Sequence, residues 1–156
     1  MIALKIQPQV SFAYLHASGG DFRKVAYLLS DVAPFYPNFK EWLFFKFQPE
    51  ARLGMRDVLL ACVDDQIVGL SLLKKTAAER KICTFYVVPS FRGRGLAYDL
   101  MDRSISAIGG SDTVITVSEE RDAELFPTLN KFGFELSDSV QDMYRPGKKE
   151  NIYRVG

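Results

Sequence analysis

Residues 92–97 read Arg-Gly-Arg-Gly-Leu-Ala, a pattern of glycines and cations that could bind an anion. The apolar run before them predicts a strand that ends at Val88, because Pro89 cannot donate to a sheet ladder. Apolar residues then recur at helical spacing over 96–108. The first N–H groups of a helix have no partner inside it, and the helix dipole favours negative charge there. We therefore expect this turn to hold a pyrophosphate, with its two arginines as additional cations.

The spacing of the glycines separates three kinds of anion-binding loop. A Walker loop needs G-x-x-x-x-G-K-[ST], and no lysine followed by serine or threonine comes after these glycines. The dinucleotide fingerprint G-x-G-x-x-G would place its third glycine at Tyr98. Residues 92–97 match R/Q-x-x-G-x-G/A at every defined position, directly after a strand that ends in Val-x-Pro. This stretch resembles the coenzyme A signature of the GNAT superfamily of N-acetyltransferases.

The rest of the chain must supply the elements that position this turn. The patterns predict strands in 1–17 and at 57–63, 66–73, 81–88, 112–117, 134–144 and 150–155, and helices at 21–31, 39–47, 94–108 and 121–132. Pro127 either bends the last helix or marks a start close to Phe126. This order is also the GNAT order, so the resemblance covers essentially the whole chain. It implies a mixed α/β (α+β) fold with a mostly antiparallel sheet of about six to seven strands, flanked by about four helices, in which the parallel strands 81–88 and 113–117 splay apart.

Length and composition restrict the class of protein. The chain has 156 residues, 47% hydrophobic and 25% charged, which predicts a single domain over 1–156. The net charge of +1 gives no general attraction to nucleic acid, and no stretch approaches the roughly 20 apolar residues of a membrane span. Because no signal peptide is evident, we expect a cytoplasmic protein in which Cys62 and Cys83 stay reduced. His16 is the only histidine, so no metal is expected.

The resemblance also implies how acetyl-coenzyme A, as co-substrate, would be held. Backbone groups of the strand before the turn would bond the pantetheine arm, and N–H groups of the turn would hold the pyrophosphate. The strand residues are Phe85, Val87 and Val88, and the turn residues are Arg92, Gly93, Arg94, Gly95, Leu96 and Ala97. By the same analogy, the amide of Val87 would polarise the thioester carbonyl as an oxyanion donor.

Two positions depart from the family's commonest catalytic pattern. Many members place a tyrosine four residues before the glycine of a Gly-Phe pair, as the acid for the departing thiolate. In this chain the pair is Gly133-Phe134, and the tyrosine's position is occupied by Leu129. The asparagine often found at the start of that helix corresponds to Asp122. The usual acid is therefore missing.

Three other residues are candidates for proton transfer. Tyr144, near the end of the sixth predicted strand, is a proton donor or else a hairpin aromatic packed on the sheet. Glu119, after the fifth strand, is a base or else a solvated acid at a helix start. Tyr86 is the third candidate, if the strand face that it shares with Ile82 lines the cleft.

The resemblance implies transfer of an acetyl group to a primary amine, on a small molecule or a protein, by direct attack. We expect the acceptor determinants in 20–56 and the last hairpin; 39–47 is dense in aromatics, at least one of which should face a cleft or a partner. A non-catalytic acyl-coenzyme A sensor is the leading alternative, because the usual tyrosine is missing. A toxin of the same fold that acetylates aminoacyl-tRNA is a second alternative, against which the near-neutral charge argues. Dimers are common among proteins of this fold, so a homodimer is also considered.

Overall fold

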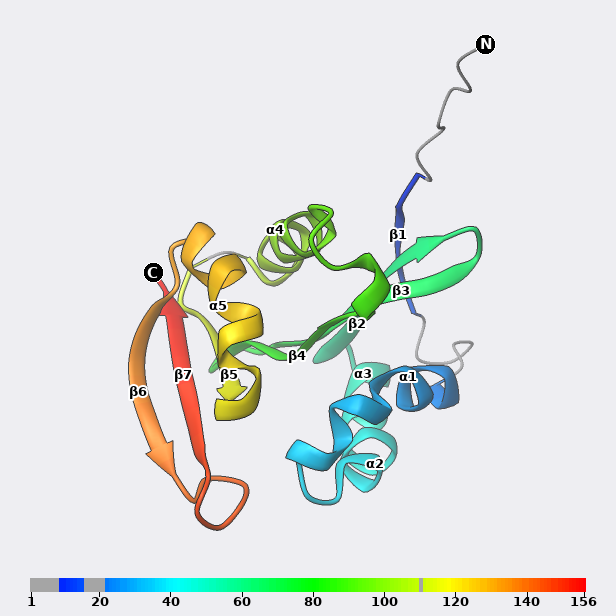
Figure 1. Cartoon of the computed structure of the whole chain (residues 1–156). Coiled ribbons are helices and arrows are strands. Elements are labelled where there is room, and N and C mark those ends of the chain that lie inside the picture. The colour runs from blue at the N-terminus through cyan, green and yellow to red at the C-terminus, as the bar shows by residue number, and fades with distance from the viewer. Residues whose placement is uncertain (1–8, 16–21, 110) are drawn as a thin grey trace.

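The computed structural model describes residues 9–15, 22–109 and 111–156, and it contains a seven-stranded mixed sheet (Figure 1). The strand order is β1-β2-β3-β4-β5-β7-β6. The strands are β1 (Ser11–Tyr14), β2 (Arg56–Val63), β3 (Gln66–Lys75), β4 (Arg80–Val87), β5 (Thr113–Ser118), β6 (Glu135–Gln141) and β7 (Lys149–Val155). All neighbours are antiparallel except β4 and β5, which are parallel. The predicted fold class is confirmed.

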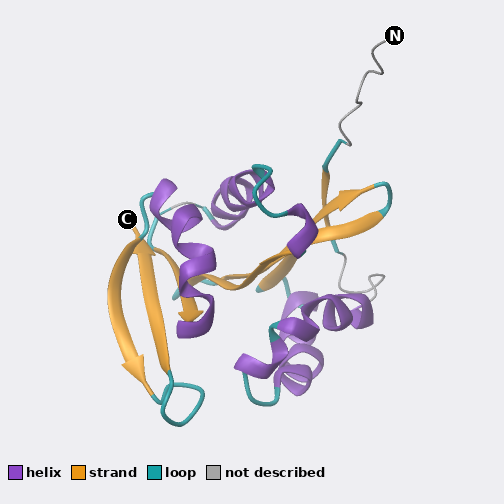
Figure 2. Cartoon of the chain, in the orientation of Figure 1, coloured by secondary structure: helices purple, strands orange, loops and turns teal. Residues whose placement is uncertain are grey.

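Helices cover both faces of the sheet (Figures 1 and 2). The helices are α1 (Phe22–Leu28), α2 (Phe39–Trp42) and α3 (Gln48–Arg52) on one face, and α4 (Leu96–Ile108) and α5 (Asp122–Lys131) on the other. Each face has its own core: Leu100 and Met101 of α4 are buried in one, and Leu29, Leu43 and Phe47 are buried in the other. The turn at 92–97 therefore lies at one end of a helix that is anchored to the sheet by burial of its apolar side.

Two helix boundaries differ from those predicted. The segment predicted to end at 47 continues through a π turn at 43–47 into α3, which has Pro49 in its first turn. Helix α5 begins at Asp122 and contains Pro127, so the alternative start close to Phe126 is wrong. The predicted helix start at Asp21 lies outside the described residues.

The parallel strands β4 and β5 separate after a short ladder, as predicted. Their pairing runs from Arg80↔Thr113 to Ile82↔Ile115 and then stops, although both strands continue. On the other side β4 stays bonded to β3, where the N–H of Val88 donates to the carbonyl of Val68 at 2.9 Å. Because the backbone groups of a strand alternate in direction, those of Phe85 and Val87 point into the gap.

A bulge changes which side chains of β4 share a face. The register against β3 slips between Leu72, which pairs with Thr84, and Leu73, which pairs with Ile82. As a result Ile82 packs in the core under α4 and α5, whereas Tyr86 packs in the core against α1–α3. The expectation that Tyr86 and Ile82 share a face is therefore wrong.

The remaining observations concern the cysteines and membrane association. Cys62 and Cys83 are free thiols, and both are half-buried. Within the described residues, every helix is too short or too polar to span a bilayer.

Candidate active site

The turn before α4 presents a row of backbone N–H groups. Gly93 and Gly95 have φ of +78° and +82°, a region that side-chain-bearing residues rarely adopt. The N–H of Arg92 bonds to the carbonyl of Pro89, and the first bond inside the helix runs from Asp99 N–H to Gly95 O at 3.2 Å. Between these two bonds, the N–H groups of 93–98 have no acceptor in the part of the chain that the structure describes. Space beside both glycines is open, so a phosphate fits against these donors.

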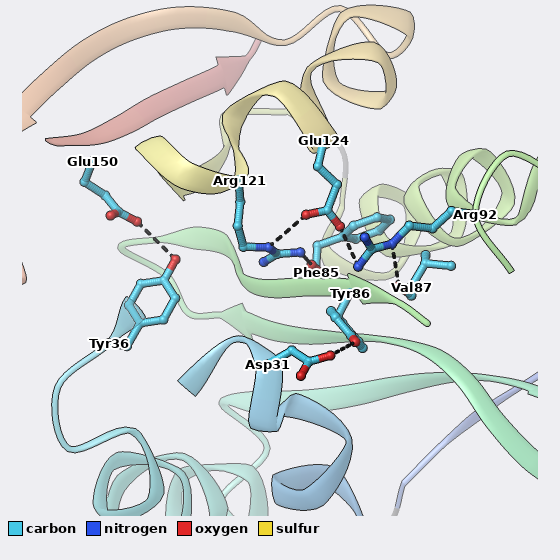
Figure 3. A network of polar contacts seen from close by, with 9 residues as sticks. All are labelled: Asp31, Tyr36, Phe85, Tyr86, Val87, Arg92, Arg121, Glu124 and Glu150. Atoms are coloured by element: carbon cyan, nitrogen blue, oxygen red, sulfur yellow. Dashed lines mark hydrogen bonds and ion pairs between the residues drawn. The ribbon is translucent and has the colours of Figure 1, made fainter. Parts of the chain in front are cut away.

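The two arginines of the turn differ in their surroundings. Arg92 points back toward the sheet, where its Nε donates to Val87 O at 2.9 Å and its Nη2 lies 2.9 Å from Glu124 Oε1 (Figure 3). Arg94 lies beside the ring of Phe91 and has no carboxylate partner among the described residues. Of the two cations that the sequence suggested, Arg94 is the one that remains available to an anion.

A second guanidinium lies at the gap between β4 and β5. Arg121, which is 6% exposed, comes from the turn that precedes α5. Its Nη2 donates to Phe85 O at 2.7 Å, and its Nε donates to Glu124 Oε2 at 3.3 Å. Glu124 thus links Arg121 to Arg92, and together the arginines hold the two β4 carbonyls that face the gap (Figure 3).

A pocket joins the glycine turn to this gap on the α4/α5 face. It is lined by Phe85 and Val87 of β4, by Gly93, Gly95 and Ala97 of the turn, and by Thr128 of α5. The side chain of Leu96 is buried beneath it, so this residue offers the pocket only its backbone. The N–H of Val88 donates to β3, and its carbonyl accepts the N–H of Phe91. Only the second lone pair of that carbonyl oxygen remains for a ligand.

A second pocket lies on the opposite face of the same strand pair. Thr84 of β4 and Thr116 of β5 line it together with aromatic residues that include Tyr36, Trp42 and Tyr144. Its lining also contains one acid and four cations: Glu79, Lys46, Arg56, Lys74 and Lys81. Phe39 and Trp42 are therefore the aromatics of 39–47 that line a cleft, whereas Phe45 is 80% exposed. The ring of Tyr144 meets that of Tyr36 edge-on, with 5.5 Å between centroids.

Behind this second pocket is a tyrosine–glutamate pair. The Tyr36 hydroxyl donates to Glu150 Oε1 at 3.1 Å, and Glu150 is 3% exposed (Figure 3). Burial raises the pKa of the Glu150 carboxyl, against the opposite effects of Tyr36, Arg145 and Lys81. Burial and the nearby Glu150 charge raise the pKa of Tyr36 far above its usual value, so the phenol stays protonated. Sequence reasoning missed this pair, because nothing in the spacing links residues 114 positions apart.

The three proton-transfer candidates lie in different surroundings. Tyr144 lines the second pocket. The Tyr86 hydroxyl donates to Asp31 at 2.9 Å, and a carboxylate oxygen of Glu119 accepts the backbone N–H of Lys149 at 3.2 Å. At the family's tyrosine position, Leu129 is 1% exposed within the core and offers no proton. At the asparagine position, Asp122 accepts hydrogen bonds from the side chains of Asn151 and Tyr153.

Solved structures of similar shape share this architecture. A GNAT-family protein from Desulfovibrio desulfuricans superposes with a TM-score of 0.75 at 18% identity, covering 94% of this chain and 98% of that one. The ribosomal-protein-S18-alanine N-acetyltransferase from Escherichia coli gives 0.73 at 14% identity, covering 94% and 93%. A GNAT acetyltransferase from Elizabethkingia anophelis, solved with acetyl-CoA bound, gives 0.64 at 16% identity, covering 94% and 97%. At these identities the likeness establishes the fold.

The sequence comparisons give the family. No curated protein matches the sequence. The model of the acetyltransferase (GNAT) domain matches residues 44–144, which contain the glycine turn, the splayed strands and α5. This match spans more than half of the chain. The chain therefore belongs to the GNAT acetyltransferase family.

Proposed function

We propose that this protein transfers the acetyl group of acetyl-coenzyme A to a primary amine. The observation that carries the proposal is the pair of pockets on opposite faces of the splayed strands, one joined to a row of free N–H groups and the other backed by a buried carboxylate. The two pockets let donor and acceptor approach the gap from opposite sides. Acetyl-CoA bound to the Elizabethkingia relative supports the choice of donor.

The donor lies in the pocket beside α5. The N–H groups of Gly93 to Ala97 hold its pyrophosphate, Arg94 adds a cation, and the pantetheine arm follows the edge of β4. The N–H groups of Phe85 and Val87 point into the gap, which supports assigning the N–H of Val87 to polarise the thioester carbonyl. The carbonyls of both residues already hold arginines, so we assign pantetheine binding to their N–H groups.

The acceptor lies in the pocket formed by Tyr36, Trp42 and Tyr144. An alkylammonium with a pKa near 10.4 must lose a proton before it attacks, and a positioned base assists this step. Tyr36 lines the pocket and its hydroxyl donates to Glu150, so a proton taken up by Tyr36 is matched by one passed to Glu150. We assign Tyr36 and Glu150 as the base, in place of Glu119, and keep Tyr144 as an acceptor-binding residue.

The test is acetyl transfer to a panel of amines by the purified protein. Release of coenzyme A thiol and mass spectrometry of the acceptor are measured together, with heated protein as control. We expect one acetyl group per thiol released, and a loss of turnover in Tyr36→Phe without a loss of acetyl-CoA binding. Binding without transfer to any amine, even at high pH, would favour the acyl-coenzyme A sensor. A salt-dependent complex with tRNA would favour the toxin.

A further inference from the structure

In the proposed reaction, the negative charge that develops on the departing sulfur has no assigned partner. When the amine nitrogen bonds to the thioester carbon, the C–S bond breaks and its electron pair stays on sulfur. The family's tyrosine would give this sulfur a proton, and Leu129 cannot. The Tyr36–Glu150 pair takes the proton that the amine loses, and it lies on the acceptor side. The sulfur therefore needs either another acid or a cation.

A cation is present where the pantetheine arm ends. The pocket runs from the glycine turn along β4, where Val87 and Phe85 lie about 7 Å apart at the usual rise of a strand. Arg121 binds the carbonyl of Phe85, at the end of this path. Its Nη2 and Nε have partners, but Nη1 has none among the described residues; Arg121 is 6% exposed, and it adjoins the pocket through Phe85 rather than lining it.

On the α5 side of Arg121, positive side chains outnumber negative ones. Glu124 is shared between Arg121 and Arg92, so two guanidinium groups face one carboxylate. On the β4 side the neutral ring of Tyr86 lies 5.9 Å from the Arg121 guanidinium and 5.5 Å from that of Arg92.

The groups on the acceptor side of Arg121 do not neutralise this excess of positive charge. The positive charge of Arg121 reaches Tyr36, whose phenol it makes more acidic, against the larger effect of burial. Glu150 lies beyond that phenol and is bonded to it, and burial raises its pKa. Asp31 accepts the hydroxyl of Tyr86 on the α1 side of the sheet.

We propose that Arg121 stabilises the departing coenzyme A sulfur as a thiolate, in place of the missing tyrosine acid. This inference rests on the proposed function. The neutral amine attacks after its first proton has passed through the Tyr36–Glu150 pair to water. The C–N bond forms, the C–S bond breaks, the second nitrogen proton passes to the same pair, and the sulfur leaves as an anion beside the guanidinium. The thiolate takes a proton from water after release, so the step needs no acid at the sulfur and no other reactant.

The affinity of free coenzyme A as a function of pH tests this directly. A cysteine thiol has a pKa of about 8.5, the simple alkyl thiol of coenzyme A has a higher one, and a cation within about 4–6 Å lowers the pKa of an acid by about 1–3 units. A thiol whose bound pKa lies below its free pKa binds more tightly as pH rises between the two values. The affinity should rise by up to about tenfold per unit of pKa shift and become constant about one unit above the pKa of the free thiol.

Desulfo-coenzyme A is the matched ligand, because it keeps every group except the thiol. Titration of Tyr36, Glu150 and Glu124 affects both ligands, so their effects cancel in the ratio of the two affinities. We expect this ratio to rise at least about fivefold between pH 6 and the pKa of the free coenzyme A thiol in the wild-type protein. Arg121→Gln should abolish the rise, and Arg121→Lys should keep part of it.

The possible results separate the role of Arg121 from the proposed function. If acetyl-CoA does not bind, the proposed function fails. If acetyl-CoA binds but the ratio is flat in the wild-type protein, the role of Arg121 is refuted and the proposed function stands. A ratio that still rises in Arg121→Gln also refutes that role. The wild-type result alone suffices if Arg121→Gln does not fold.

Discussion

The backbone conformation of Gly95 gives a quantitative test of the pyrophosphate site. Gly95 has φ of +82°, and a Cβ added there would meet nothing within 4 Å. Gly95→Val therefore causes no clash inside the protein, but it imposes a left-handed conformation that costs about 1–2 kcal/mol for a residue with a side chain. It also places methyl groups in the open space where the phosphate is expected.

The expected loss of affinity follows from the bonds at risk. A valine that relaxes to negative φ turns away at least one N–H group, and a hydrogen bond to a charged partner is worth about 1.5–3 kcal/mol. The Kd for acetyl-CoA should therefore rise by at least about tenfold, since 1.4 kcal/mol corresponds to a factor of ten. Isothermal titration calorimetry measures the Kd, and urea denaturation measures the free energy of unfolding.

Gly54→Val is the matched control. Gly54 has φ of +78° and equally open surroundings, but it lies in the turn before β2. It should lose a similar free energy of unfolding and keep the wild-type Kd. The reasoning is refuted if Gly95→Val binds acetyl-CoA as tightly as wild type, or if Gly54→Val weakens binding equally.

Three further variants test the site and its surroundings. Tyr36→Phe should lower kcat about a hundredfold. It should also move the acidic limb of the kcat/KM profile to higher pH, because Glu150 loses the hydrogen bond that lowers its carboxyl pKa. An acidic limb that does not move would remove Glu150 from the mechanism. Ser118→Ala should make the protein about 1 kcal/mol more stable, because the buried Ser118 hydroxyl has no partner among the described residues. Ser104→Ala should instead cost about 1–3 kcal/mol, because the Ser104 hydroxyl makes two hydrogen bonds. Equal losses on thermal unfolding would contradict this. Arg94→Gln should weaken acetyl-CoA binding about fivefold at low salt and less at high salt, and a salt-independent effect would argue against a phosphate contact.

Local patterns predicted the fold and the position of the turn. The turn at Gly93 and Gly95 was predictable because glycine adopts positive φ without steric cost, whatever its distant neighbours are. The boundary of β4 followed from Pro89 in the same way. The splay of β4 and β5 followed from the family resemblance, and the short ladder between them bears it out.

Contacts between distant segments could not be predicted. Tyr36 and Glu150 meet because a loop between helices and the last strand converge at the gap, and neither residue has a distinctive neighbourhood in the sequence. The bulge that separates Ile82 from Tyr86 depends on pairing with β3, which hydrophobic alternation within β4 does not encode. The inward direction of Arg92 depends on Glu124, a residue 32 positions later that reads as an ordinary surface acid.

The central claim is that the pocket between β4 and α5 binds acetyl-coenzyme A for acetyl transfer. Calorimetric titration with acetyl-CoA, set against ATP and NAD under the same conditions, tests it most directly. We predict binding of acetyl-CoA with one site per chain, and much weaker binding of the two nucleotides that lack a pantetheine arm. Absence of acetyl-CoA binding, or a preference for ATP or NAD, would contradict the claim and leave the glycine turn as a general anion site.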